Sequence, residues 1–232
     1  MKTDSGLKPL VLFGCGKIAE VVLQVLRQSG QRRVAAVCAD RDYLPGSVWQ
    51  GLPTVAFEDV ASQFPPEQFE MFIALGYQQM NELRASKCAA ARALGYTLTS
   101  VQGPNVQLPS DCQHGDNCFF LGPVHVHPCV KFGSNVFVWS GAIIGHHSVV
   151  GDDCWITSGA NVAGVVRLGA GSFLAINSTV VNGVSVGVRC FVGANALITK
   201  STQDEQVFVA ESSKPQRLNS RQFFRMSGIG SL

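Results

Sequence analysis

A strict six-residue period dominates the second half of the chain. Every sixth residue from Phe120 to Ile198 is apolar, and the residue four places later is small or valine. The apolar positions are Phe120, Val126, Phe132, Val138, Ile144, Val150, Ile156, Val162, Leu168, Leu174, Val180, Val186, Val192 and Ile198. A period of this kind predicts a parallel β-helix, in which three hexapeptides form one triangular coil and the apolar residues fill its interior.

The first hundred residues follow a different pattern. Apolar runs at 7–13, 34–38, 69–75 and 97–101 predict buried strands, and helical spacing predicts helices at 17–27 and 80–94. This alternation predicts a small Rossmann-like parallel α/β domain over residues 1–102. The fold class is therefore α/β plus β, with a β-helix domain over 103–200 and a tail over 201–232. We expect the tail, including Phe223 and Phe224, to pack on the β-helix.

Composition and charge exclude several classes of protein. Lys and Arg number 18 against 16 Asp and Glu, which gives no reason to expect a nucleic-acid or membrane partner. No apolar run approaches the roughly 18 residues of a membrane span. The segment Met1–Lys8 is polar and lacks a signal-peptide pattern. The eight cysteines form no Cys-x-x-Cys pair, which favours free thiols in a reducing, cytoplasmic compartment.

A glycine-rich turn follows the first predicted strand. Gly14, Cys15 and Gly16 open the predicted helix, and Ala19 completes a G-x-G-x-x-A motif. Backbone N–H groups at such a helix start can hold a phosphate. Asp40 ends the next strand, so it is expected near the same edge. The motif is compatible with a nucleotide-sugar site, an NAD site or a purely structural turn.

Two adjacent histidines are the candidates for acid–base chemistry. His146 and His147 follow the interior residue Ile144 by two and three places, so both side chains should point outward at a turn. A histidine there can accept a proton near neutral pH, and the alternative is a pair of solvated side chains. His127 and His146 are 19 residues apart and fall at different places of the hexapeptide. We therefore predict no metal site.

The arrangement of these motifs resembles the NeuD/PglD family of sugar O- and N-acyltransferases. The stretch 144–152 (IGHHSVVGD) resembles the active-site segment of the family, and 158–164 and 173–178 resemble the two following coils. The resemblance implies that the β-helix is left-handed and that the chain forms a homotrimer with active sites between neighbouring prisms. It also implies acetyl-CoA or another acyl-CoA as co-substrate.

The resemblance assigns roles to particular residues. His146 matches the general base, while His147 stands where the family has a carboxylate. Lys17 would face a diphosphate, and Gly76 and Tyr77 would line the nucleotide-sugar site beside Asp40. The positions that match acyl-CoA contacts are Trp155, Gly164, Ile176 and Ala194. We expect Trp155 to lie outward on a prism face, where it can touch a cofactor or a neighbouring chain.

The expected activity is N-acylation of a nucleotide-linked amino sugar of the 4-amino-4,6-dideoxy type, in surface-glycan synthesis. Two alternatives remain open. One is O-acetylation of a sugar hydroxyl, for example on a sialic acid. The other is a non-catalytic trimer that binds a nucleotide sugar, which the absence of a carboxylate at 147 would favour.

Overall fold

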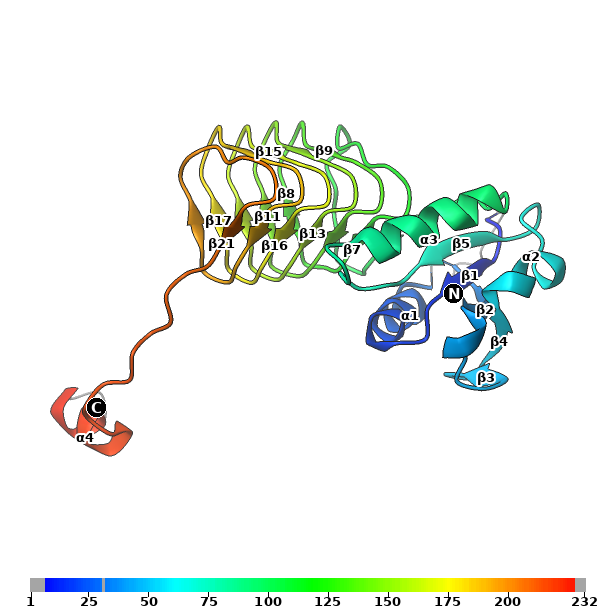
Figure 1. Cartoon of the computed structure of the whole chain (residues 1–232), viewed down its shortest axis with the longest axis horizontal. Coiled ribbons are helices and arrows are strands. Elements are labelled where there is room, and N and C mark those ends of the chain that lie inside the picture. The colour runs from blue at the N-terminus through cyan, green and yellow to red at the C-terminus, as the bar shows by residue number, and fades with distance from the viewer. Residues whose placement is uncertain (1–6, 31, 228–232) are drawn as a thin grey trace.

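The chain folds into an N-terminal α/β domain, a triangular β-helix and an extended tail (Figure 1). The computed structural model describes residues 7–30 and 32–227. The segment 1–6, considered above for a signal peptide, lies outside the described residues. Among the described residues, no helix combines the length and the apolar character needed to span a membrane.

The N-terminal domain is a five-stranded sheet with helices on both faces. Its strand order is β3-β4-β2-β1-β5, parallel except for the β3–β4 hairpin, which the sequence analysis missed. The strands are β1 (Leu10–Phe13), β2 (Val34–Ala39), β3 (Val48–Trp49), β4 (Leu52–Ala56) and β5 (Glu70–Ile73). The helices are α1 (Lys17–Ser29), η1 (Arg41–Tyr43), η2 (Phe57–Asp59), α2 (Val60–Gln63) and α3 (Glu82–Ala93).

Successive side chains of β1 point alternately into the two hydrophobic layers of this domain, one on each side of the sheet. Leu10 and Leu12 pack with α1, while Val11 and Phe13 pack with α2 and α3. Helix α1 begins after Gly16 and ends at Gly30, whose left-handed backbone lets its N–H donate to the Leu26 carbonyl. The predicted helix at 17–27 is thus confirmed.

The segment predicted as the fourth strand joins the two domains instead. Leu98 forms a single parallel bridge with Met71 of the N-terminal sheet. Three residues later, β6 (Val101–Gln102) pairs with the first strand of the β-helix. The prediction of one strand at 97–101 was therefore wrong, because the chain leaves one sheet and enters the next within this segment.

The β-helix has three parallel sheets, and successive strands of a sheet are 18 residues apart, except that Phe191 pairs with Val207 after 16 residues. The docked face, next to the N-terminal domain, contains β6, β7 (Phe119–Phe120), β10 (Phe137–Val138), β13 (Trp155–Ile156), β16 (Phe173–Leu174), β19 (Phe191–Val192) and β21 (Val207–Phe208). The open face contains β8 (His125–Val126), β11 (Ile143–Ile144), β14 (Asn161–Val162), β17 (Thr179–Val180) and β20 (Leu197–Ile198). The third face contains β9 (Lys131–Phe132), β12 (Val149–Val150), β15 (Arg167–Leu168) and β18 (Ser185–Val186).

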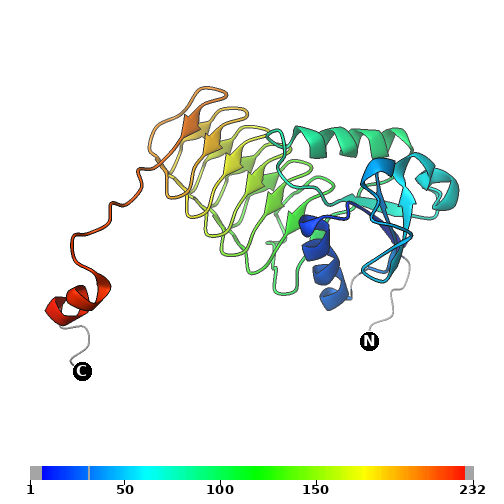
Figure 2. The same cartoon turned by 60° about the horizontal axis from the view of Figure 1, so that its bottom comes forward.

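The predicted interior of the β-helix is confirmed. All fourteen periodic apolar residues are buried, and the small residues four places later complete the same core. The stacked coils are seen side-on in Figure 2. One place in each corner has a positive φ, and these residues are mostly asparagine and glycine, such as Asn135, Gly159 and Asn177. Both residue types tolerate this left-handed conformation.

The N-terminal domain is fastened to the docked face by aromatic rings and one arginine. Phe137 and Trp155 stack on each other with ring centroids 5.0 Å apart. The Arg84 side chain, fully buried on α3, lies 4.4 Å from the Phe137 ring. Its guanidinium also donates to Gly76, Asn81, Asn135 and Asp153. Burial lowers the pKa of Arg84 to about 10, so the guanidinium remains charged at neutral pH.

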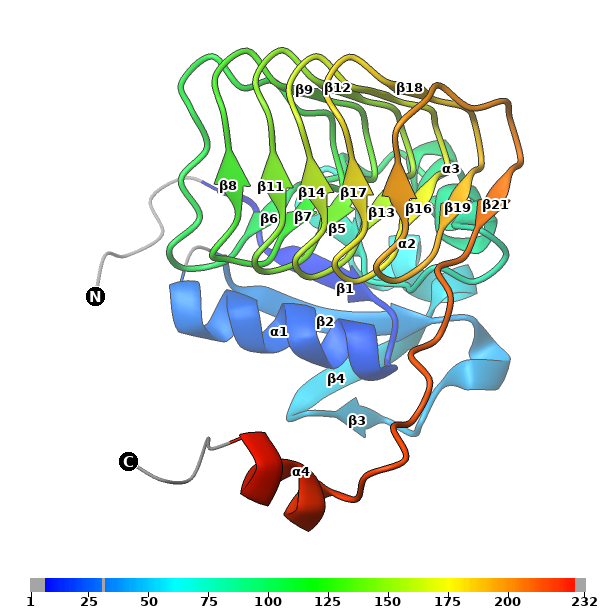
Figure 3. The ribbon, with the colours of Figure 1, turned by 90° about the vertical axis from the view of Figure 1, so that its left-hand side faces the viewer.

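The C-terminal helix of the tail does not pack on the β-helix as predicted. Strand β21 continues the docked face, but every residue of α4 (Ser220–Ser227) is exposed and the helix stands away from the β-helix in Figures 1 and 3. Phe223 and Phe224 are 48% and 54% exposed. The expectation that this pair packs on the prism was wrong, because the segment between β21 and α4 leads the chain away from it.

Candidate active site

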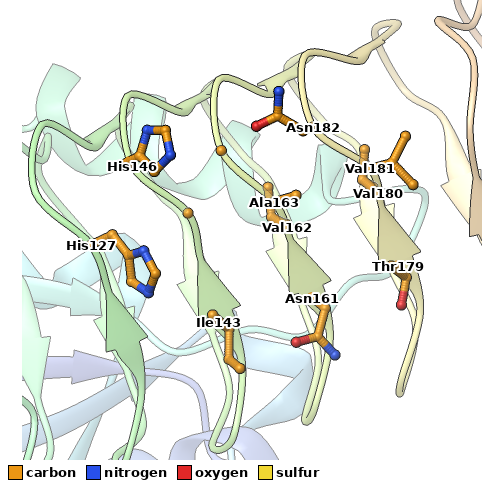
Figure 4. Close-up of a pocket in the computed structure, with 12 residues that line it drawn as sticks. His127, Ile143, His146, Asn161, Val162, Ala163, Thr179, Val180, Val181 and Asn182 are labelled. Atoms are coloured by element: carbon orange, nitrogen blue, oxygen red, sulfur yellow. The ribbon is translucent and has the colours of Figure 1, made fainter.

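A surface groove crosses the open face of the β-helix at its corner with the third face (Figure 4). Its volume is about 460 Å³. The lining residues come from four successive coils: His127, Ile143, Gly145, His146, Asn161, Val162, Ala163, Gly164, Thr179, Val180, Val181 and Asn182. The groove therefore combines an apolar floor with a few polar groups, a composition typical of small-molecule sites.

His146 stands over a notch that only glycine can leave open. A Cβ atom at Gly164, in the next coil, would lie 2.6 Å from His146 Nε2 and 3.0 Å from Asn182 Oδ1. A Cβ atom at Gly145 would lie 2.5 Å from the Gly164 nitrogen. Glycine at 164 thus leaves room for the His146 ring beside the Asn182 amide oxygen, and glycine at 145 lets the Ala163–Gly164 backbone pack against it. A reacting group bound at this corner would meet His146 Nε2 as a proton acceptor, with the Gly164 backbone next to it.

The two histidines interact directly. His146 Nδ1 and His147 Nδ1 are 3.2 Å apart, and both side chains are exposed, as expected for corner positions. One of the two nitrogens must carry the hydrogen of this bond. If His146 Nδ1 donates it, His146 Nε2 keeps a free lone pair facing the Gly164 notch. This tautomer is the one a general base requires.

A carboxylate lies on the corner that carries His147. Asp111, Cys129 and His147 are separated by 18 residues each and occupy one corner of successive coils. The Cys129 N–H donates to Asp111 Oδ2 at 2.7 Å. Hydrogen bonds from Cys129, with a smaller contribution from the charge of His147, hold the pKa of Asp111 below its usual value. Asp111 was not among the residues predicted from the sequence, although its 18-residue spacing from Cys129 points to it.

The prediction for metal chemistry concerned His127 and His146. Both line the groove, yet no group of three metal-ligating side chains occurs in the described part of the chain. Asn161, Thr179 and Asn182, which the sequence analysis also missed, add polar groups to the same groove. The 18-residue spacing could have indicated Asn182, because it follows Gly164 by one coil.

The residues expected to contact acyl-CoA do not lie together in one chain. Gly164 is in the groove, but Ile176 and Ala194 are exposed at the opposite end of the open face, on its corner with the docked face. Trp155 is only 2% exposed, because the N-terminal domain covers it and Tyr77 packs against its ring. The expectation that Trp155 touches a cofactor was therefore wrong. It points outward from the prism but is sealed in the domain contact.

The glycine turn has a well-defined shape in the structure. Gly14 has a φ of 115°, and a Cβ atom there would lie 2.9 Å from the Ala74 carbonyl oxygen, so glycine is required. Gly16 is the N-cap of α1, and Lys17 is exposed beside it. Cys15 donates through its thiol to the Tyr43 carbonyl, and burial raises the pKa of that thiol.

The other predicted nucleotide-sugar residues divide between two places. Asp40 lies at the end of β2, next to the glycine turn, and forms a 2.5 Å ion pair with Lys87. Gly76 instead accepts a hydrogen bond from Arg84. Tyr77 packs edge-on against Phe173 with centroids 4.9 Å apart, although half of its surface stays exposed. Gly76 and Tyr77 thus help to join the domains.

Comparisons with known proteins agree with the fold. No protein-family model matches the chain, and no curated protein matches it either. The acetyltransferase domain of PglB from Neisseria gonorrhoeae has a similar structure, with a TM-score of 0.78 and 23% identity over 90% of this chain and all of that one. A mutant perosamine N-acetyltransferase from Caulobacter crescentus, in complex with CoA and GDP-perosamine, gives 0.67 and 23% over 90% of this chain and 99% of that one.

WeeI from Acinetobacter baumannii is a third similar structure, with a TM-score of 0.60 and 16% identity over 89% of this chain and 98% of that one. At these identities the likeness establishes the fold. The predicted fold class, a small α/β domain followed by a left-handed parallel β-helix, is therefore confirmed. The similar structures named as an acetyltransferase domain and as a perosamine N-acetyltransferase share this fold with the chain.

Proposed function

We propose that this chain is an acyl-CoA-dependent N-acyltransferase, with acetyl-CoA as the expected donor and a nucleotide-linked amino sugar as the acceptor. The observation that carries the proposal is the notch at Gly164, where His146 Nε2 lies against the Gly164 backbone in a groove with an apolar floor and a few polar groups. Two structures of similar fold contain CoA with GDP-perosamine or acetyl coenzyme A. A base next to an oxyanion donor is the arrangement that acyl transfer needs.

The reaction follows from this geometry. The lone pair of the sugar amine attacks the thioester carbonyl, and the new C–N bond forms while His146 Nε2 takes the proton of the amine. The Gly164 N–H donates to the oxyanion of the tetrahedral intermediate. Collapse of the intermediate breaks the C–S bond, and the His146 imidazolium returns its proton to the leaving thiolate. His147 Nδ1 accepts the hydrogen of His146 Nδ1 throughout and fixes its tautomer.

Asp111 supplies a negative charge that His147 itself lacks. Because His147 replaces a carboxylate of the family pattern, the imidazolium formed on His146 would otherwise face only a neutral ring. Asp111 lies two coils from His147 on the same corner, where it accepts the Cys129 N–H, and its negative charge favours an imidazolium on this corner. We therefore propose that Asp111 supports the histidine pair by its charge.

The proposed site requires more than one chain. The N-terminal domain packs on the docked face, whereas His146 lies on the open face at its far corner. In a homotrimer, the prism corner carrying Ile176 and Ala194 of one chain can border the groove of the next. The glycine turn, Lys17 and Asp40 would hold the nucleotide and direct the amine toward a neighbouring His146. Light scattering that gives a mass near 25 kDa, close to the 24.8 kDa of one chain, would contradict this arrangement.

The direct test is acetyl transfer from acetyl-CoA to a panel of UDP-, dTDP- and GDP-linked amino sugars, followed by mass spectrometry. The expected result is the addition of one acetyl group and release of CoA, and Gly164→Ala should reduce the rate roughly 100-fold or more, because its Cβ displaces His146. Gly183→Asn is the matched control, since no atom lies within 4 Å of a Cβ there. Failure of the protein to bind acetyl-CoA would instead favour the non-catalytic trimer.

A further inference from the structure

The C-terminal tail has a charge pattern unlike the rest of the chain. Four of the 18 basic residues, Lys214, Arg217, Arg221 and Arg225, lie within twelve positions, and the last acidic residue of the chain is Glu211. The rest of the chain contains 14 basic residues and all 16 acidic residues. The tail is therefore strongly basic, whereas the body of the protein is slightly acidic.

Helix α4 separates its apolar and basic residues on opposite sides. With 3.6 residues per turn, Phe223, Phe224 and Met226 fall on one side and Arg221 and Arg225 on the other. Phe223, Phe224 and Met226 are 48%, 54% and 74% exposed, and no residue of the helix is buried. An eight-residue helix has little stability in water by itself, and packing of its apolar side against a partner would stabilise it.

We propose that α4 lies on an anionic lipid surface and attaches the protein to it peripherally. A short helix with aromatic residues on one side and arginines on the other is suited to the boundary between acyl chains and headgroups. The four cations complement acidic lipid headgroups, and the body of the protein has no comparable excess of positive charge. The segment 209–219 has no regular structure and separates the helix from the β-helix (Figure 1).

The test is flotation of the full-length protein with vesicles of equimolar phosphatidylcholine and phosphatidylglycerol, compared with pure phosphatidylcholine. The protein should float with the anionic vesicles and be released at about 1 M salt, where charges are screened beyond roughly 3 Å. Arg221→Gln combined with Arg225→Gln should reduce partitioning roughly 30-fold. Phe223→Ser combined with Phe224→Ser should also reduce binding, with the melting temperature unchanged.

The matched control removes two charges from the prism instead. Lys131→Gln combined with Arg167→Gln changes exposed residues of the third face, and flotation should stay as in the unmodified protein. Equal flotation with neutral vesicles, no flotation, or an equal loss in the control would overturn the proposal. A change of oligomeric size in the Phe223 and Phe224 variant, without vesicle binding, would show that α4 docks on a second copy of the chain and would also overturn it.

Discussion

The docked face and the open face of the β-helix share one hexapeptide register but carry different outward residues. The outward ladder of the docked face is Phe119, Phe137, Trp155, Phe173 and Phe191. The outward ladder of the open face is His125, Ile143, Asn161, Thr179 and Leu197. In both ladders, the next residue along the chain is a buried apolar residue of the prism interior.

The two ladders differ in how much of their side-chain surface is buried away from water. Aromatic side chains offer a large apolar area, and the first four of this ladder are almost completely buried against the N-terminal domain, while Phe191 stays partly exposed. The mixed ladder of the open face stays partly solvated and leaves the groove with His146 free. One face of a regular prism thus supports the fold, and another remains available for chemistry.

The largest expected effect is on catalysis at the open face. His146→Ala should lower turnover roughly 10²–10⁴-fold, the usual contribution of a general base, with little change in stability because the side chain is exposed. A pH–rate profile should show partial rescue at high pH if the acceptor is an amine, and no rescue if it is a hydroxyl. His147→Ala should cost less; the opposite order would show that His147 is the base.

The next largest effect concerns the docked face. Trp155→Ala should destabilise the protein by about 3–5 kcal/mol, because it opens a cavity between the two domains. Ile143→Ala, at the same hexapeptide position on the open face, should cost about 0.5 kcal/mol or less. Chemical denaturation measures both. Equal losses of unfolding free energy in the two variants would contradict the difference in burial between the two faces.

A smaller effect tests the contribution of Asp111. Asp111→Asn should lower turnover roughly tenfold and shift the acid limb of the pH–rate profile to lower pH, because a negative charge near His147 is lost. Asp152→Asn is the control. It removes a carboxylate that also accepts from a backbone N–H one coil away, but at another corner. An unchanged profile in Asp111→Asn would leave this residue with a structural role only.

The smallest effect is a gain in stability beside the groove. Val165 has a φ of 60°, which is unfavourable for a β-branched residue, and its side chain is half exposed. Val165→Asn should therefore stabilise the protein by about 1 kcal/mol. Val188→Asn, at an exposed corner position without positive φ, should have no such benefit. A loss of stability in Val165→Asn would show that the valine side chain makes a favourable contact.

Local patterns predicted the regular parts of the molecule well. The periodic apolar residues marked the interior of the β-helix, and the Gly14 turn marked the start of α1. The adjacent histidines were found because they follow the interior residue Ile144 by two and three places, at a turn where side chains point outward. Asp111 and Asn182 were missed because their relation to His147 and His146 appears only when the coils are stacked at 18 residues.

The sequence by itself determined the coils of the β-helix, because each hexapeptide contributes its own interior residue and its own turn. Only the tertiary structure decided which outward residues are buried. Trp155 lies outward, as its place in the hexapeptide requires, but a domain folded more than 60 residues earlier covers it. Phe223 and Phe224 show the reverse, since apolar residues expected to be buried remain exposed on α4. Burial of an outward side chain depends on a distant surface, and a local pattern carries no information about that surface.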